Sequence, residues 1–389
     1  MVAAKIKKFL IKRSQAAETR RLTSEDLERL GAMFSSIESG DVLSRPSKDW
    51  VELNKMNVAQ LQKHGYENFK RTIALNYFTF VRILPWDSQF RFLLRRLPIG
   101  VSLACLKKSL LARRHDYFSV FNRIQSLLYN FLTFASWEYS RGAVTDTALL
   151  ALREPEDGNP AETRDTSGAL VSQDLANSVL EVSAMGPTLA PGSVVLELGA
   201  GYGRDAYVML ATNPGIKYVI VDIPPALWVA ETYLRRQFPD HRIFRYREFA
   251  NFKDVEREFS ESDIAFFLST QIKRLPDGIA DLGVNISSLH EMRPEQIAFY
   301  FSQFDRLLKD GGQFYFKAWK RSTLPFENIV IRQEDYPIPV SWNCEFSRET
   351  PIQTRFFEAR YRKFRTRPSI SHEREAPLAP RSANRASTD

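Results

Sequence analysis

The sequence has few cysteines and few histidines. Its 389 residues include only two cysteines, Cys105 and Cys344, which lie far apart and in neither a CxxC nor a CxxH spacing. This excludes a disulfide framework and a cysteine-based zinc site, and it fits a reducing cytoplasm. The five histidines form no His-x-His or HExxH pattern. We therefore expect no resident metal, although magnesium sites leave too little pattern in a sequence to be tested this way.

Long apolar runs are also missing. No stretch approaches the roughly 18 uninterrupted apolar residues that a membrane span needs, so we expect a soluble protein. A hydrophobic fraction of 44% is ordinary for a globular chain. At this length one hydrophobic core stops growing, which favours two structural units or one domain with a large extension.

The net charge of +8 is concentrated at the two ends of the chain. Residues 1–22 hold seven basic residues and one acidic residue. Residues 364–389 hold five basic and three acidic residues, and the part of the chain between these two ends has no net charge. A neutral body lacks the broad basic face of a nucleic-acid binder, so we expect no nucleic-acid partner. Residues 5–13 can form a basic amphipathic helix at a membrane surface, or belong to a solvated terminus. Charges interrupt their apolar run, so they do not resemble a secretory signal.

The pattern of apolar residues divides the chain into four parts. Spacings of three and four, with a capping sequence at residues 23–26, predict helices from about 24 to 143. Prolines and Gly158 at 155–160 mark a loop before a further helix at 170–185. We expect a basic tail (1–22), a helical N-terminal region (23–150), an α/β domain (165–363) and a disordered tail (364–389).

Aromatic residues are dense in the helical N-terminal region. They are positioned either to line a substrate cleft or to fill a packed helical core, and the sequence leaves both readings open. The residues concerned are Trp50, Tyr66, Phe69, Tyr77, Phe78, Phe80, Trp86, Phe90 and Phe92.

From residue 193 onward the pattern changes to strands that alternate with helices. The β-rich runs lie at 194–198, 218–222, 264–268, 282–286 and 313–317. Such alternation predicts a Rossmann-like α/β fold, a mostly parallel sheet covered by helices on both faces. Ligands of such sheets bind at the carboxyl ends of the strands.

A glycine-rich turn follows the first of these strands. Gly199, Gly201 and Gly203 form a G-x-G-x-G pattern, with Glu197 two residues before the first glycine. The dinucleotide fingerprint is instead G-x-G-x-x-G, which seats a pyrophosphate at a helix N-terminus. An acid beside the turn suits a positively charged ligand, and S-adenosylmethionine carries both an ammonium and a sulfonium. The glycines let the backbone approach its amino-acid part closely.

The second strand ends on an acid, Asp222, with Ile223 after it. A carboxylate at this point accepts hydrogen bonds from ribose hydroxyls in both NAD- and S-adenosylmethionine-binding folds. Asp222 and Ile223 therefore predict a nucleoside cofactor without choosing between the two.

The motifs together resemble a family of bacterial sugar O-methyltransferases. The similar segments are residues 50–54, 65–71, 172–178, 197–204, 221–227 and 285–292, and residues 275–291 and 306–312 resemble later motifs of class I methyltransferases. The resemblance spans most of the chain between about 45 and 320. It implies a mostly parallel seven-stranded sheet with a helical N-terminal extension. It also implies S-adenosylmethionine as cofactor and a sugar or glycan hydroxyl as acceptor.

Methyl transfer to a hydroxyl needs alignment and a base that takes the hydroxyl proton. His290 follows the strand at 282–286, beside the expected methyl position, and is the first candidate for that base. A packed or helix-capping histidine is the alternative. Glu291 is able to serve instead or to orient His290, although adjacent side chains on a helix point apart.

Five more polar residues are candidates for holding the cofactor. Asn285 and Ser287 are expected at its amino-acid part, or as caps of the next helix. Gln271 is expected at the adenine, unless it belongs to a solvated loop. Gln173, with Asp174, starts a helix that either closes over the cofactor or only packs.

Several functions agree with these features. The favoured one is O-methylation of a sugar or glycan precursor; the others are O-methylation of another small metabolite, RNA methylation assisted by the basic tails, and a cofactor-binding protein without activity. Fold alone does not decide among them. RNA binding would weaken steeply with salt.

Overall fold

The computed structural model describes residues 22–72, 87–112, 122–161, 163–165, 167–186, 189–324 and 327–364. Almost all of the predicted basic tail (1–22) and of the predicted disordered tail (364–389) lie outside these ranges. So do four of the aromatic residues expected in a cleft or core, namely Tyr77, Phe78, Phe80 and Trp86.

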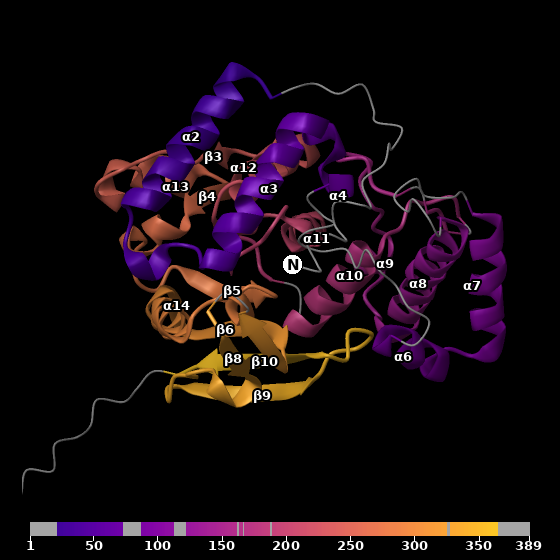
Figure 1. Ribbon diagram of the computed structural model, residues 1–389. Helices are drawn as coiled ribbons and strands as arrows, with labels where there is room; N and C mark the ends of the chain where they lie inside the picture. The colour runs from indigo at the N-terminus through magenta and orange to yellow at the C-terminus, as the bar shows by residue number, and fades with distance from the viewer. Residues whose placement is uncertain are drawn as a thin grey trace, which may run out of the picture.

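The centre of the molecule is an eight-stranded sheet with the order β3-β4-β2-β1-β5-β6-β10-β9 (Figure 1). The pairs from β3 to β6 are parallel, and β10 runs antiparallel to both β6 and β9. The strands are β1 (Val194–Leu198), β2 (Lys217–Asp222), β3 (Ile243–Phe244), β4 (Ile264–Leu268), β5 (Ala280–Ile286), β6 (Leu308–Trp319), β9 (Trp342–Glu349) and β10 (Phe356–Lys363).

The five predicted strands are present as β1, β2, β4, β5 and β6. The expected count of seven strands differs from the eight observed. The additional edge strand β3 has only two residues, Ile243 and Phe244, which is too short to leave an alternating pattern in the sequence. A separate hairpin of β7 (Arg321–Leu324) and β8 (Ile329–Arg332) follows β6.

Helices cover both faces because the central strands are apolar on both sides. Val195 packs into one core and Leu196 into the other. The first core holds α10 (Gln173–Met185), α11 (Arg204–Thr212) and α12 (Ala226–Gln237). The second holds α13 (Glu256–Glu261) and α14 (Pro294–Leu307). Gly283 on β5 lies against α14, where an added Cβ would come within 2.9 Å of Phe304.

The region before the sheet is helical. α2 begins with a capping box in which the Thr23 side chain and the Asp26 side chain each accept a backbone hydrogen bond, and it packs Leu30 and Met33 into the first core. The helices are α2 (Ser24–Ser39), η1 (Val42–Ser44), α3 (Lys48–His64), η2 (Tyr66–Asn68), α4 (Phe69–Thr72), α6 (Ser88–Arg96), α7 (Ile99–Leu111), α8 (Asn122–Ala143) and α9 (Thr147–Leu150).

The N-terminal helices are not all placed together. α2 and α3 lie over the sheet domain, whereas α6, α7 and α8 form a group at the opposite side of the molecule (Figure 1). α10 packs between α8 and α11 and so connects this group to the sheet. Within the described ranges, no helix is both long enough and apolar enough to cross a bilayer.

Candidate functional site

A pocket opens at the carboxyl ends of β1, β2, β4 and β5. The chain leaves β1 toward β2 and β4, then returns to β5 on the other side of β1, so this is the topological switch point where α/β sheets bind ligands. The space between its walls is about 840 Å³, which includes solvent at its open mouth. The sheet side of its lining consists of Leu198, Gly199, Gly201, Asp222, Ile223, Ala226, Ser269, Ile286, Ser287, Ser288, Glu291, Met292, Gln296 and Tyr300.

The glycine-rich turn forms one wall of this pocket. Gly199, Gly201 and Gly203 have φ values of 75°, 62° and 84°, in the left-handed region that favours glycine. Their N–H groups are already used within the protein: Gly199 donates to the Val221 carbonyl at 2.8 Å, and Gly203 donates to the Ala200 carbonyl at 3.0 Å. Gly201 donates to Asp222 Oδ2 at 2.8 Å. These three N–H groups are therefore not free for a phosphate.

Gly199 also permits a close approach between two loops. An added Cβ would lie 2.5 Å from Ser288 Oγ and 2.6 Å from its Cβ, which is closer than real atoms approach. The turn after β1 and the segment after β5 therefore meet at this glycine. Gly203 is the last glycine of the turn and is the N-cap residue of α11.

Asp222 lies at the end of β2, where its carboxylate is buried to 7% exposure yet borders the pocket. Its Oδ1 accepts a hydrogen bond from the Ile223 N–H at 2.7 Å, and its Oδ2 accepts the bond from Gly201. Burial raises the pKa of Asp222 to about 7, against these two bonds, which lower it. Each oxygen keeps a second lone pair, so the ionised group is able to accept two further hydrogen bonds from a ligand.

Asn285 has a structural function beside the pocket. Its side-chain amide donates to the Leu198 carbonyl at 2.9 Å and contacts Ser288 Oγ at 2.5 Å. Asn285 is fully buried, and the described pocket lining contains its neighbours Ile286, Ser287 and Ser288 instead. Ser287 has a φ of 59°, a strained conformation for a residue other than glycine, of the kind found at functional sites.

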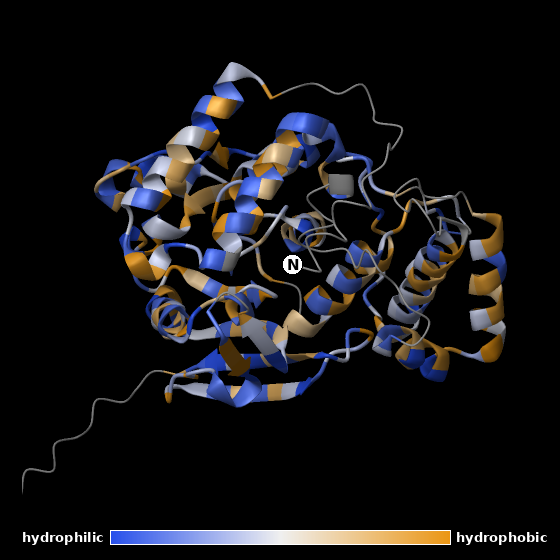
Figure 2. Ribbon diagram, in the orientation of Figure 1, coloured by the Kyte–Doolittle hydropathy of each residue, from blue (hydrophilic) through white to orange (hydrophobic). Residues whose placement is uncertain are grey.

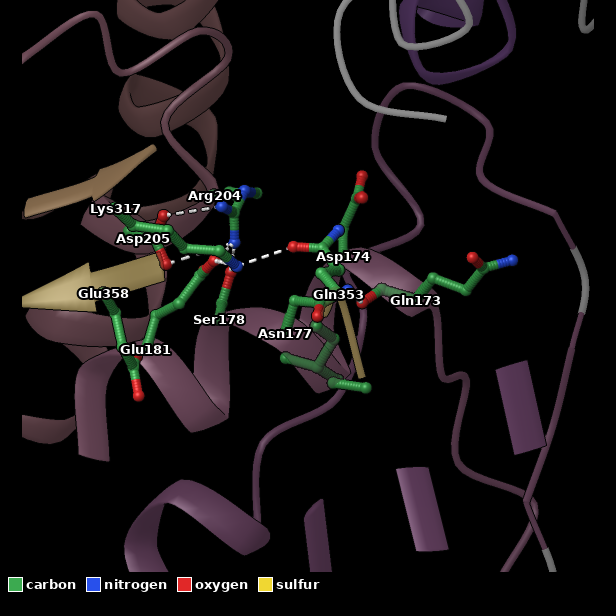
Figure 3. Close-up of polar contacts among 12 residues, drawn as sticks. Gln173, Asp174, Asn177, Ser178, Glu181, Arg204, Asp205, Lys317, Gln353 and Glu358 are labelled. Carbon is green, nitrogen blue, oxygen red and sulfur yellow. Dashed lines mark hydrogen bonds and ion pairs between the residues drawn. The ribbon is translucent and has the colours of Figure 1, made fainter. Parts of the chain in front are cut away.

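Gln271 and Gln173 also lie away from the pocket lining. Gln271 is fully buried: its Oε1 accepts from the Leu268 N–H at 3.0 Å, and its Nε2 donates to the Arg247 carbonyl at 2.9 Å. The neighbour of β4 that borders the pocket is Ser269. Gln173 begins α10 and has Thr133 Oγ1 at 3.5 Å from its Nε2. Figure 3 shows it pointing away from the charged side chains around Arg204.

Glu197 faces the first core and is absent from the described pocket lining. The Tyr218 hydroxyl lies 2.8 Å from Glu197 Oε2. Burial and the nearby charge of Asp205 raise the pKa of Glu197 well above its ordinary range. A carboxyl group with a raised pKa is biased toward its neutral form, so the expected attraction for a sulfonium or an ammonium does not follow from this geometry.

A network of buried charges surrounds Glu181 on this face of the sheet (Figure 3). Glu181 lies between Arg204 Nη1 and Lys317 Nζ, each at 2.5 Å. Although burial raises the pKa of Glu181, these two cations lower it to about 2. Arg204 also contacts Asp205, at 3.3 Å. The network joins α10, α11 and β6. Its side chains contact each other and do not line the pocket.

His290 and Glu291 have different environments although they are adjacent in η5 (Leu289–Glu291). His290 is 3% exposed and packs near Trp319 and Phe356, with ring centroids 6.1 and 5.9 Å away. Burial lowers the pKa of His290 to about 3, far below the ordinary value near 6.5. Its Nδ1 has no hydrogen-bond partner among the described residues. Glu291 borders the pocket, and its Oε1 lies 3.7 Å from His290 Nε2.

The opposite wall of the pocket comes from the N-terminal region, of which the sequence had identified only Trp50 as a candidate for lining a cleft. Backbone carbonyls of this segment accept hydrogen bonds from the sheet domain: Ser44 from Ser269 Oγ at 2.9 Å, and Arg45 from Gln296 Nε2 at 2.6 Å. Such contacts depend on tertiary structure and leave no local pattern. The wall consists of Ser44, Arg45, Pro46, Ser47, Trp50 and Leu53.

Of the described aromatic residues expected in a cleft or core, only Trp50 borders this pocket. Tyr66 and Phe69 are buried in the first core, and Phe90 is buried near α8. The packed-core interpretation therefore holds for these three. No group of three or more His, Cys, Asp or Glu side chains in the described ranges is arranged to hold a metal ion.

No protein-family model and no curated protein matches this sequence. Among solved structures, the chain is similar to an S-adenosylmethionine-dependent methyltransferase from Aquifex aeolicus, with 16% identity, a TM-score of 0.30, and 47% of this chain and 87% of that chain covered. It is also similar to the [4+2]-cyclase SpnF (15% identity, TM-score 0.36, coverage 49% and 82%). A third similar structure is geranyl diphosphate methyltransferase in complex with geranyl diphosphate and sinefungin. It has 12% identity and a TM-score of 0.33, and the match covers 48% of this chain and 76% of that chain. These likenesses are too low to assign a function, which must come from the pocket.

Proposed function

We propose that this protein is an S-adenosylmethionine-dependent O-methyltransferase that acts on a hydroxyl of a sugar or of a similar small molecule. The observation that carries the proposal is the pocket at the switch point, in which the glycine turn and Asp222 lie together below a wall from the N-terminal region. The motifs that resemble sugar O-methyltransferases, residues 197–204 and 221–227, contribute directly to it.

The hydrogen bonds of the turn favour this cofactor over a dinucleotide. A pyrophosphate needs free backbone N–H groups at the turn, and those of Gly199, Gly201 and Gly203 already have acceptors within the protein. Glu291, and Asp222 in its ionised form above its raised pKa of about 7, would also repel a pyrophosphate and attract a cation. The residues present therefore fit a ligand without phosphates and with positive charge.

Asp222 would accept hydrogen bonds from the ribose hydroxyls. Ile223 and Ala226 supply apolar surface beside it, and Ser269 lies where the adenine is expected from the fold. When bound, the cofactor supplies a methyl group on a sulfonium. The protein has to hold the acceptor oxygen in line with that group and remove its proton.

Glu291 is the better placed of the two candidate bases. It borders the pocket, whereas His290 is buried behind it. We assign Glu291 as the base that accepts the hydroxyl proton. His290 is a positioning residue that packs against Trp319 and Phe356 and keeps η5 in place.

The acceptor side of the pocket combines an aromatic ring with polar groups. Trp50 lies on the same wall as Arg45 and Ser47, and Glu291 and Gln296 line the pocket from the sheet domain. An apolar surface with a few placed hydrogen-bonding groups is what orients a small polar molecule in a pocket. This supports a hydroxylated acceptor such as a sugar.

Calorimetry tests the cofactor, and label transfer tests the reaction. We expect binding of S-adenosylmethionine or its demethylated product and none of NAD; the reverse result would contradict the proposal. Incubation with methyl-labelled S-adenosylmethionine and glycan, small-molecule and RNA fractions should place label in a glycan or small molecule. Label in RNA, or cofactor binding without any transfer, would favour one of the other functions.

The base is tested by Glu291→Gln, which should lower turnover by roughly 10² to 10⁴ while cofactor affinity is retained, because general-base catalysis contributes about that much. Glu295→Gln is the matched control, since Glu295 is an exposed neighbour that is absent from the described pocket lining. His290→Gln should leave the pH profile near neutrality unchanged, since burial holds the pKa of His290 near 3. If instead His290→Gln abolishes turnover and changes the pH profile near neutrality, and Glu291→Gln does neither, His290 is the base and Glu291 is not.

A further inference from the structure

α7 is apolar on both of its sides. One side packs in the core shared with α8 through Cys105, which is fully buried. The other side carries Ile99, Leu103, Leu106 and Leu110, at spacings of four, three and four, which place them on one face of a helix. These side chains are 81%, 60%, 40% and 67% exposed. A contiguous apolar face of a helix is normally packed against another apolar surface, so this exposed face suits contact with a second apolar environment.

The exposed apolar residues are concentrated here. Of the thirteen large apolar side chains that are exposed in the described part of the chain, six lie between residues 94 and 111. Besides the four on the face of α7, they are Leu94 at the end of α6 and Leu111 at the end of α7. Figure 2 shows α7 as a largely hydrophobic ribbon at the edge of the molecule. Exposed apolar surface gathered in one place marks an interaction site.

Basic residues predominate in the segment that carries this face. Residues 88–114 contain seven basic residues and no acidic residue, although the body of the chain is neutral, and the nearest acid before them is Asp87 at the N-cap of α6. Four of these basic residues, Arg91, Arg95, Arg96 and Lys107, are exposed. Lys108 contacts Glu138 of α8 at 3.3 Å, and its charge is therefore partly balanced. Positive charge is thus exposed on the same segment of the chain, with Lys107 on α7 itself and three arginines on the preceding helix α6.

We propose that α6 and α7 form a membrane-binding surface that lies on an anionic lipid bilayer, with the leucines of α7 in the acyl boundary and the arginines and Lys107 at the phosphates. A helix of thirteen residues is about 20 Å long and fits in the interface plane without crossing it. Long basic side chains extend from such a helix to the headgroups. Ile99, Leu103, Leu106 and Leu110 would be the residues that enter the lipid.

The charges favour lipid over other occupants. A second copy of this chain, docked face to face, would bring the same basic residues against each other. A neutral apolar protein groove would satisfy the leucines and leave the arginines without partners, whereas an anionic bilayer satisfies both. The surface is separate from the pocket, because no residue between 88 and 143 lines it among those described. The inference therefore does not depend on the proposed function.

Vesicle sedimentation of the full chain tests this surface. We expect binding to vesicles of phosphatidylcholine with phosphatidylglycerol, and little binding to phosphatidylcholine alone. The double variant Leu103→Gln/Leu110→Gln should weaken partitioning by roughly 30-fold, since two partly inserted leucines are lost. Arg95→Gln/Lys107→Gln should remove most of the preference for the anionic lipid. Val340→Gln, which changes a fully exposed apolar residue outside α6 and α7, should bind as the wild type does.

Because the substituted leucines are exposed, the variants should keep the circular dichroism and thermal midpoint of the wild type. The proposal fails if the leucine variant, folded, sediments with anionic vesicles as well as the wild type does, since the basic terminus would then suffice. It also fails if the wild type does not bind these vesicles. A wild-type dimer that the leucine substitutions convert to a monomer, without any vesicle binding, would assign the face to a second copy instead.

Discussion

Asp222 serves both the fold of the turn and the proposed ligand. Its two oxygens hold the N–H groups of Gly201 and Ile223, so the carboxylate fixes the glycine turn against β2. The same oxygens border the pocket. A substitution of Asp222 should therefore affect both ligand binding and the order of the glycine turn, and different experiments measure these two effects.

Asp222→Asn should lower the affinity for S-adenosylmethionine by on the order of 1 to 3 kcal/mol, because a charged acceptor of the ribose hydroxyls is replaced by an amide. Calorimetry measures this, with Asp240→Asn as an exposed control. Since burial raises the pKa of Asp222 to about 7, the wild-type affinity should also fall between about pH 8 and about pH 6, and the variant should lose this dependence. An unchanged affinity in a folded variant would remove Asp222 from the site.

At the scale of elements, the pocket depends on how closely the turn after β1 approaches η5. Gly199 is the point of contact, since any side chain there meets Ser288. Asn285 binds the same two segments together through the Leu198 carbonyl. The spacing between the two segments is therefore set by the absence of a side chain at Gly199 and by the side-chain amide of Asn285.

Gly199→Ala should reduce cofactor affinity by more than about tenfold, because Ser288 has to move and the left-handed backbone is strained. Gly192→Ala provides a matched control: Gly192 also has a left-handed φ, of 84°, but an added Cβ meets nothing within 4 Å. It should lower the thermal midpoint slightly and leave affinity unchanged. Equal effects of the two substitutions on affinity would mean that strain, and not the contact with Ser288, is responsible.

Periodic and local patterns were sufficient to predict the five central strands and the glycine turn, because each is encoded within a few neighbouring residues. Asp222 and Ile223 were identified in the same way, from a strand ending on an acid. The positions of Gln271 and Asn285 were not predictable, since their amides are used by backbone groups that only the folded chain brings near. Except for Trp50, which was a candidate for a cleft, the wall from Ser44 to Leu53 was missed for the same reason: it is far in sequence from every motif it faces.

On the scale of the whole molecule, buried acids make stability depend on pH. Burial raises the pKa of Asp174 to about 6 and of Asp205 and Asp222 to about 7. Each binds its proton more tightly when folded, so its contribution to the free energy of unfolding is largest at low pH and is lost as pH rises through the folded pKa. His290 acts in the opposite direction up to about pH 6.5. Glu181, with a pKa lowered to about 2, is constant above about pH 5.

The protein without ligand should therefore lose on the order of 4 kcal/mol of unfolding free energy between about pH 5 and about pH 7, because the buried acids, with Glu197 in addition to these three, outweigh one histidine. Thermal melts across this range, read by calorimetry, should show a midpoint that falls as pH rises. Asp222→Asn should make the decline less steep. A midpoint that rises steadily from pH 5 to pH 7 would show that these carboxyl groups are already ionised in the folded protein.

The wall made by residues 44–53 also bears on where the chain can be divided. A boundary drawn near residue 165, just before the sheet domain, would keep the glycine turn, Asp222 and Glu291 on one piece and leave Arg45 and Trp50 on the other. A fragment cut there would lack one side of its own binding site even if its sheet formed. For the same reason, an exchange of the α/β domain between related chains would have to include the segment from Asp41 to Leu53. The smallest piece with a complete binding site is therefore longer than the α/β domain.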